Sequence, residues 1–246
     1  MNFLEPLNNL IKLAENAGMS QFVYEAWNVV NIAVVSIFCL IYRKHYDIKR
    51  SHAVLVPILM YLVGDAFILL LGWIAMGFQY FGSNNIVKGF SFFPLVGLLA
   101  AKIFKIEWKR LMDFCAPAFP LLQFTAHIAC NFAGCCCGYP MEGGVWNPIW
   151  NKYLFPTQLL ESLVSLLIFI ACLIYAKKQN YEVTGKVYPF FLVTFGVTRF
   201  FLEFLRCNEK LFWGISELAL WALLMVIVGT VWFIKAGKKS SKKSKK

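Results

Sequence analysis

Apolar segments of about 20 residues recur along almost the whole chain, and short polar stretches that carry most of the charge separate them. A helix of about 20 residues is long enough to cross the hydrocarbon core of a bilayer. The pattern therefore predicts an all-α integral membrane protein with seven transmembrane helices. These helices are expected at about residues 22–42, 53–76, 88–106, 114–136, 157–176, 187–205 and 213–235.

The first 20 residues follow a different pattern. Leu7, Leu10, Ile11 and Ala14 recur at the spacing of one helix face, and Pro6 can start a helix. This indicates a short amphipathic helix on the membrane surface rather than a secretory signal, which needs a basic start and a longer apolar run. The expected organisation is a surface helix at residues 1–20, a seven-helix transmembrane domain at residues 21–236 and a basic cytoplasmic tail at residues 237–246.

The positive charges predict the orientation of the helices. Short cytoplasmic loops are enriched in Lys and Arg. If the N-terminus is outside, most of the 24 Lys and Arg residues fall on the inner side. These are Arg43, Lys44, Lys49, Arg50, Lys102, Lys105, Lys109, Arg110, Lys177, Lys178, Lys186 and the lysines of the C-terminal end. The prediction is N-terminus out and C-terminus in, with the tail close to anionic lipid headgroups.

The composition is typical of a membrane protein, and this changes how the net positive charge is interpreted. Hydrophobic residues make up 59% of the chain, charged residues only 15%, and mean hydropathy is +0.62. The net charge of +11 is accounted for by the inner loops and tail, so nucleic acid is not expected as a partner.

Ionisable residues within predicted helices indicate a site, because a charge at mid-bilayer costs about 2.5–3.5 kcal/mol on insertion scales. In "FGVTRFFLEFLR", Arg199, Glu203 and Arg206 share one helix face, so Glu203 can bridge both arginines. The alternative interpretation, a purely structural cluster of ion pairs that holds helices together, remains open. Asp65, in the second helix, is another buried charge, and the sequence names no partner for it.

Three predicted helices bring polar groups to the outer half of the bilayer. "FPTQLLES" places Gln158 and Glu161 near the outer end of the fifth helix, close in depth to Arg199. The fourth helix brings His127 and the stretch "HIACNFAGCCCGYP" toward the same side. Arginine binds phosphate through a planar fork of donors, so we expect an anionic phospholipid headgroup here. A transport pathway or proton relay is the alternative, although the two halves of the chain show no repeat.

The chain resembles the bacterial prolipoprotein diacylglyceryl transferases and their looser relatives over about its last 160 residues. The resemblance lies in residues 113–138, in "FPTQLLES" and in "FGVTRFFLEFLR". It implies transfer of a diacylglyceryl group from phosphatidylglycerol to the cysteine thiol of a lipoprotein precursor, at the outer face of the bacterial cytoplasmic membrane. It also implies that Arg199 holds the lipid phosphate, that Glu203 and Arg206 complete the network, and that Gln158 and Glu161 line the cavity.

The chain departs from the transferases at two helices. His127 stands where the family has arginine, and Phe93 and Pro94 stand where it has a histidine followed by glycines. His127 could replace the arginine, act as a base for the thiol, or be an ordinary core histidine. The catalytic residues expected are Arg199, Glu203, His127 and Glu161, and the expected substrate-binding residues are Arg206, Gln158, Gly134, Gly138 and Asn131. A non-catalytic or rerouted lipid-binding relative is the second hypothesis, and a small transporter the third.

The cysteines at the end of the fourth helix leave several interpretations open. Cys135, Cys136 and Cys137 could be small packing residues, a disulfide partner of Cys207, or a reactive thiol or metal ligand. The sequence has no CxxC pair and no Cys/His spacing typical of zinc, so neither a metal nor a cofactor is predicted. Gly134 and Gly138 would let the backbone turn or approach closely at this site.

Overall fold

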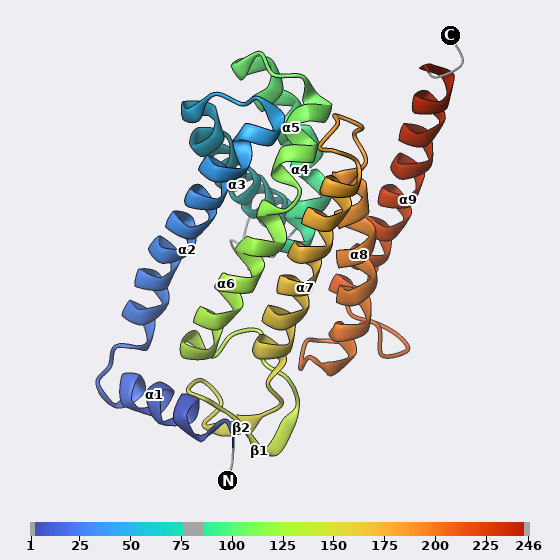
Figure 1. Ribbon diagram of the computed structural model, residues 1–246. Coiled ribbons are helices and arrows are strands. Elements are labelled where there is room, and N and C mark those ends of the chain that lie inside the picture. Colours follow the sequence, from blue (N-terminus) through green and yellow to red (C-terminus); the bar gives the residue numbers. More distant parts are fainter. Residues whose placement is uncertain (1–2, 76–85, 244–246) are drawn as a thin grey trace.

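The computed structural model describes residues 3–75 and 86–243 and is mostly helical (Figure 1). Its elements are α1 (Glu5–Asn16), α2 (Ser20–Tyr42), η1 (Arg43–Tyr46), α3 (Arg50–Ala75), α4 (Ile86–Phe104), α5 (Trp108–Cys115), α6 (Ala118–Ala133), β1 (Pro140–Asn147), β2 (Lys152–Leu154), α7 (Thr157–Lys178), α8 (Val187–Leu202), η2 (Glu203–Leu205) and α9 (Glu217–Lys243). The N-terminal helix and the β-hairpin lie at one end of the bundle, and α5 and the end of α9 lie at the other.

Four helical segments in the described residues are long and apolar enough to cross a membrane: Ser20–Tyr46, Thr157–Lys178, Val187–Leu205 and Glu217–Gly237. Arg50–Gly64 and Phe92–Phe104 are shorter apolar helices. Leu163, Leu167 and Ile174 are about half exposed on one face of α7, as expected for side chains that contact lipid. The chain is a multi-pass membrane protein, in agreement with the expected class.

The predicted fourth helix is two helices in the structure. α5 ends at Cys115 and α6 begins at Ala118, with Pro117 at its N-cap. Proline has no backbone N–H and fits a helix start, which accounts for the interruption. α6 then ends at Gly134, whose φ of +69° is left-handed. The predicted end at residue 136 was too late, and Cys135 and Cys136 belong to a loop.

The C-terminal helix is longer than the hydropathy pattern indicates. α9 begins at Glu217, later than the predicted residue 213, and continues to Lys243. The boundary between the helical domain and the basic tail at residues 236 and 237 is therefore not a helix end. Residues 244–246 of the predicted tail lie outside the described residues, as do residues 1–2 of the surface helix, residue 76 of the second helix and the side chain of Asp65.

A two-stranded antiparallel hairpin departs from the all-α expectation. In the segment between α6 and α7, β1 pairs with β2 through Val145 and Leu154, and through Trp146 and Tyr153. The predicted surface helix forms as α1 and docks on this hairpin. Asn8 donates from Nδ2 to the Gly144 carbonyl at 3.1 Å and accepts the Trp146 N–H at 2.8 Å. Pairing of buried backbone groups therefore fixes α1 to β1.

An aromatic core holds the middle helices together. Phe90 and Phe93 of α4 pack against Phe119 of α6, and Phe90 also packs against Phe191 of α8. The ring centroids of Phe93 and Phe119 are 4.9 Å apart, and Phe93 is 2% exposed. The position where the family resemblance leads one to expect a histidine is thus a fully packed apolar one.

Candidate functional site

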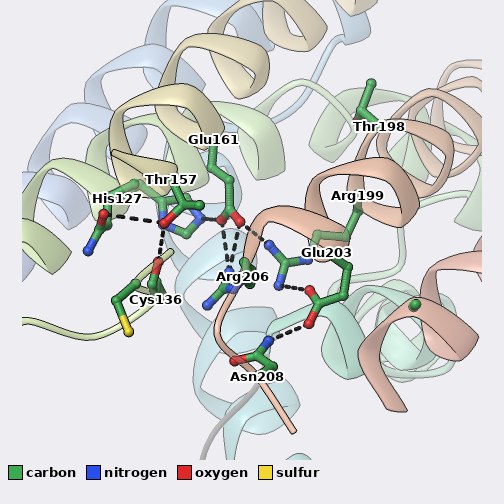
Figure 2. A network of polar contacts seen from close by, with 12 residues as sticks. His127, Cys136, Thr157, Glu161, Thr198, Arg199, Glu203, Arg206 and Asn208 are labelled. Atoms are coloured by element: carbon green, nitrogen blue, oxygen red, sulfur yellow. Dashed lines mark hydrogen bonds and ion pairs between the residues drawn. The ribbon is translucent and has the colours of Figure 1, made fainter. Parts of the chain in front are cut away.

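Glu161 of α7 is the centre of a buried ionic cluster (Figure 2). Its Oε1 pairs with Nη1 of Arg199 and with Nη1 of Arg206, the latter at 2.8 Å. Its Oε2 accepts a hydrogen bond from His127 Nε2 at 2.8 Å. The side chains come from α6, α7, α8 and the segment after η2, and each is at most 6% exposed. The structure therefore joins four of the predicted site residues around one carboxylate.

Glu203 forms the second carboxylate of the cluster. Its Oε2 lies 2.7 Å from Nη2 of Arg199, so that guanidinium bridges the two acids. Its Oε1 accepts from Asn208 Nδ2 and, at 3.0 Å, from the Ser216 hydroxyl. Lys210 Nζ donates to the Glu203 carbonyl at 2.8 Å. Two carboxylates and two guanidiniums thus form one continuous network, with a lysine at its edge.

The expectation that Glu203 bridges both arginines was wrong. α8 ends at Leu202, Glu203–Leu205 is a 3-10 turn, and Arg206 has an extended backbone. Because the helix does not continue, Arg206 leaves the face that it would share with Arg199. Its guanidinium pairs with Glu161 instead. Glu161 is therefore the residue that links both arginines.

Several buried nitrogens of the cluster have no acceptor or donor among the described residues. They are Nε of Arg199, Nε of Arg206 and Nδ1 of His127. A buried polar group left unpaired costs about 1–3 kcal/mol, so such groups usually mark a place for a ligand or water. The two guanidinium N–H groups can only donate, and they therefore suit an anion.

A small pocket adjoins the cluster between α7 and α8. Its polar lining residues are His127, Glu161, Ser165, Thr198 and Arg199. Val164 and Leu202 are among its apolar lining residues. A ligand with an anionic group and an apolar remainder fits this combination, because each part would meet a matching surface.

The loop after α6 is attached to the site through its backbone. Gln158 Nε2 donates to the Cys135 carbonyl at 2.8 Å, and Thr157 Oγ1 donates to the Cys136 carbonyl at 2.7 Å. Gly138 pairs with Arg206 in a short β-bridge, and a Cβ there would lie 2.7 Å from the Phe155 carbonyl oxygen. Gln158 and Gly138 therefore position the loop and the Arg206 segment.

Gly134 and Asn131 lie at the end of α6 with local roles. The left-handed Gly134 accepts a hydrogen bond from Asn147 Nδ2 at 2.8 Å, and a Cβ on it would approach Asn147 to 2.9 Å. Asn131 donates to the His127 and Ile128 carbonyls of its own helix, each at 3.1 Å. Its contacts are within α6 and not with the carboxylates of the cluster.

Sequence reasoning missed four polar residues that contact the cluster or its loop: Thr157, Asn208, Lys210 and Ser216. One signal was available for Lys210, since it is among the few cations outside the predicted inner loops. Asn208 and Ser216 follow Arg206 in a segment with no regular pattern, so no sequence signal places them at Glu203.

The cysteines in this region are free thiols in the structure. Cys207, the residue considered as a disulfide partner, lies beside Cys137 but forms no disulfide with it. The Cys207 N–H donates to the Cys137 carbonyl at 3.1 Å, and its Sγ lies 3.2 Å from the same oxygen. This backbone pairing continues the contact between Gly138 and Arg206.

A family model described as prolipoprotein diacylglyceryl transferase matches residues 59–235, well over half of the chain. The chain belongs to the prolipoprotein diacylglyceryl transferase family. The match contains the whole ionic cluster and most of the described helices, from the second half of α3 to α9. α1 and α2 lie outside it, as does the first half of α3.

Individual family members are similar to this chain at modest identity. A phosphatidylglycerol–prolipoprotein diacylglyceryl transferase of Clostridium tetani is 31% identical over 115 residues, which cover 43% of this chain and 45% of that protein. A second such transferase, from Clostridium perfringens, is 24% identical over 175 residues, or 68% of this chain and 67% of its own length. One from Streptococcus pyogenes is 31% identical over 35% of this chain and 34% of its own length. The first of these matches thus covers less than half of the relative.

Proposed function

We propose that this protein transfers the diacylglyceryl group of phosphatidylglycerol to the cysteine thiol of a lipoprotein precursor peptide. The observation that carries the proposal is the pair of buried, acceptor-free Nε–H groups of Arg199 and Arg206, with Arg199 also lining a partly apolar pocket. A phosphodiester would satisfy these donors, while its acyl chains lie along the lipid-facing side of α7 and α8. The names of the relatives and the family membership support the same substrates.

The reaction needs a thiolate and a stabilised leaving group. The acceptor thiol gives up its proton, which ends on the departing glycerol phosphate, and its sulfur attacks the glycerol carbon that carries the phosphate. A C–S bond forms while the C–O bond to phosphate breaks, and the electron pair leaves with glycerol phosphate. Arg199 and Arg206 face the oxygen on which negative charge grows. Charged donors fixed in a water-poor site stabilise such charge strongly, because they need no reorganisation during the step.

The carboxylates hold the guanidiniums rather than the substrate. Glu161 contacts both arginines and Glu203 contacts Arg199, so each guanidinium is held before a lipid arrives. Lys210 adds a positive charge at the edge of the cluster, which otherwise has two arginines against two acids. His127 is hydrogen-bonded to Glu161 and stands where the family resemblance leads one to expect an arginine. Gln158, Gly134 and Gly138 bind substrate, in this proposal, through the loop whose backbone they fix, and Asn131 contributes as the residue that ends α6.

The proposed topology is seven crossings with the N-terminus out and the C-terminus in, in the bacterial cytoplasmic membrane. Arg43, Lys105, Lys178 and Lys186 belong to connections at the end of the bundle opposite the hairpin (Figure 1). The positive-inside rule supports placing that end in the cytoplasm. The cluster, the hairpin and α1 then face the outer leaflet.

A second candidate function is lipid binding without transfer. The observation that favours it is Phe93, which is buried among aromatic rings where the resemblance leads one to expect a histidine. A phenylalanine cannot accept the thiol proton. A protein of this kind would bind phosphatidylglycerol through the same arginines and would release no glycerol phosphate.

The deciding experiment combines complementation with a purified assay. The chain is expressed in bacteria depleted of their own lipoprotein transferase, and the purified protein is incubated with phosphatidylglycerol and a precursor peptide that contains the acceptor cysteine. The expected product is a diacylglyceryl-peptide, which Arg199→Ala removes and Arg50→Ala, at an exposed arginine, does not. Binding of phosphatidylglycerol without any such product would favour the second candidate. Wild-type activity of Arg199→Ala would reject the site.

A further inference from the structure

Three potential metal ligands meet beside the ionic cluster. The ligand atoms of His127, Cys130 and Cys136 all lie within 4.8 Å of one another. His127 and Cys130 are three residues apart on α6 and so lie on neighbouring positions of one helix face. Cys136 returns to them from the loop that begins at Gly134. This spacing differs from the usual zinc motifs, which explains why the sequence did not predict it.

The orientation of His127 leaves one nitrogen available for a metal. Nε2 is bound to Glu161 Oε2 at 2.8 Å. Nδ1 is buried and has no hydrogen-bond partner among the described residues, and the whole residue is only 6% exposed. Metal-binding histidines commonly donate their second ring N–H to a carboxylate, which fixes the tautomer and the ring orientation. Glu161 provides this arrangement for Nδ1 coordination.

The thiols have surroundings that favour metal binding. Cys130 and Cys136 contact each other, and the guanidinium of Arg206 lies beside Cys136. The thiolate is the form of cysteine that binds metals. The backbone of Cys136 is left-handed, at φ 58°, and Thr157 holds its carbonyl. A non-glycine residue in this region is strained, so the surrounding structure must hold it in place.

We propose that His127 Nδ1, Cys130 Sγ and Cys136 Sγ bind a thiophilic divalent cation of the Zn²⁺ class. In a tetrahedral zinc site, ligand atoms lie about 3.5–3.8 Å apart, so a small contraction of the observed triangle is sufficient. Soft sulfur ligands with an imidazole select zinc over calcium or magnesium. The Cys135 thiol contacts both sulfurs and is a candidate for a fourth position.

The proposal also changes the role of His127. An imidazole that binds a metal through Nδ1 and donates from Nε2 to Glu161 has no nitrogen left for proton transfer. His127 would then be a neutral ligand that joins the metal to the arginine cluster, and not the base for the acceptor thiol. The metal site does not depend on the proposed transfer reaction, since its occupancy is measured directly.

The test uses the full chain in detergent, reduced and freed of metal with a chelator. Co²⁺ is then added as a spectroscopic probe. One Co²⁺ per chain is expected, with intense thiolate-to-cobalt charge-transfer absorption that disappears when Zn²⁺ is added. Cys130→Ser and Cys136→Ser should remove this absorption. Cys172→Ser, at a buried cysteine of the core, and Cys207→Ser, at an exposed one, should retain it.

A second measurement needs no variant and so does not depend on the folding of one. Zn²⁺ should protect Cys130 and Cys136 of the wild-type chain from maleimide, while Cys207 stays reactive. The proposal is overturned if the reduced wild-type chain gives no charge-transfer absorption, or if Cys136→Ser gives the same absorption. A disulfide between Cys130 and Cys136 in protein purified without reductant and without bound metal would also overturn it.

Discussion

Arg206 forms its ion pair with Glu161, which lies on α7, 45 positions earlier in the chain. This pair connects the segment after α8 to the first turns of α7. Because Arg199 uses the same carboxylate, the two cations depend on one anion. Removing one partner of a buried pair leaves an uncompensated charge, at a cost of about 3–5 kcal/mol.

Glu161→Gln should therefore affect both stability and activity. The amide keeps the shape of the side chain but leaves Arg199 and Arg206 without their shared negative charge. We expect a lower unfolding temperature in detergent and a loss of transferase activity of about 100-fold or more. Glu209→Gln, at an exposed position of the neighbouring segment, is the control and should match the wild type in both measurements. An active Glu161→Gln protein would contradict the central role of this carboxylate.

Arg199→Lys tests whether the planar guanidinium group of Arg199 matters beyond its positive charge. Nη1 of Arg199 contacts Glu161 and Nη2 contacts Glu203, and a single ammonium cannot reproduce this two-sided geometry. We expect a fall of about 10–100-fold in kcat/KM for phosphatidylglycerol, consistent with loss of one or two charged hydrogen bonds. Arg50→Lys, on the exposed start of α3, should leave kcat/KM unchanged. Equal kcat/KM for both variants would show that charge alone suffices.

Asp113 should stabilise the fold far from the cluster. Its carboxylate accepts the Gly185 N–H at 2.7 Å and the Val187 N–H at 3.0 Å, so it caps the start of α8 from α5. Asp113→Ala leaves two buried donors unpaired and should cost about 1–3 kcal/mol for each. Thermal unfolding in detergent measures the loss. The matched control is Glu182→Ala, an exposed acid in the same connection, and a loss of similar size there would refute the capping role.

Asn8→Ala should detach α1 from the hairpin. Asn8 makes both a donated and an accepted hydrogen bond with β1, whereas its neighbour Asn9 is exposed. We expect limited proteolysis to cut Asn8→Ala within or next to α1 several times faster than the wild type, because local opening becomes easier. Asn9→Ala should be cut at the wild-type rate. Identical digestion patterns for the two variants would mean that other contacts hold α1.

Cys137 should alkylate slowly at ordinary pH. Burial and the neighbouring Cys207 thiol raise the pKa of Cys137 to about 12. The thiolate is the reactive form, so below this pH the thiol stays protonated and unreactive. Iodoacetamide labelling followed by mass spectrometry at several pH values should show Cys137 reacting far more slowly at pH 8 than in the denatured chain. Equal rates in the folded and denatured chain would contradict this pKa shift.

The helices could largely be placed from the sequence, because hydropathy over about 20 residues reports membrane burial directly. The predicted sixth helix, at residues 187–205, matches α8 and η2. The break between α5 and α6 was missed because Pro117 lies within an otherwise apolar run. The hairpin at residues 140–154 was missed because its pairing follows from contacts with α1 rather than from a clear alternation of polar and apolar residues.

The residues that meet in the ionic cluster could be predicted from the sequence better than the ion pairs between them. Arg199, Glu203, Glu161 and His127 were identified because charges are rare inside apolar helices. Their pairing was not, since it depends on where α8 ends, and a helix end cannot be located to within one turn from hydropathy. The meeting of Cys136 with His127 likewise depends on the left-handed turn at Gly134, which brings the loop back toward α6.

The docking of α1 on the hairpin has a practical consequence for anyone who purifies this protein. A fusion tag at the amino end would sit next to the contact between Asn8 and β1, here called the clamp. The end of α9 projects from the opposite end of the bundle (Figure 1), so an affinity handle placed there leaves both the clamp and the cluster untouched.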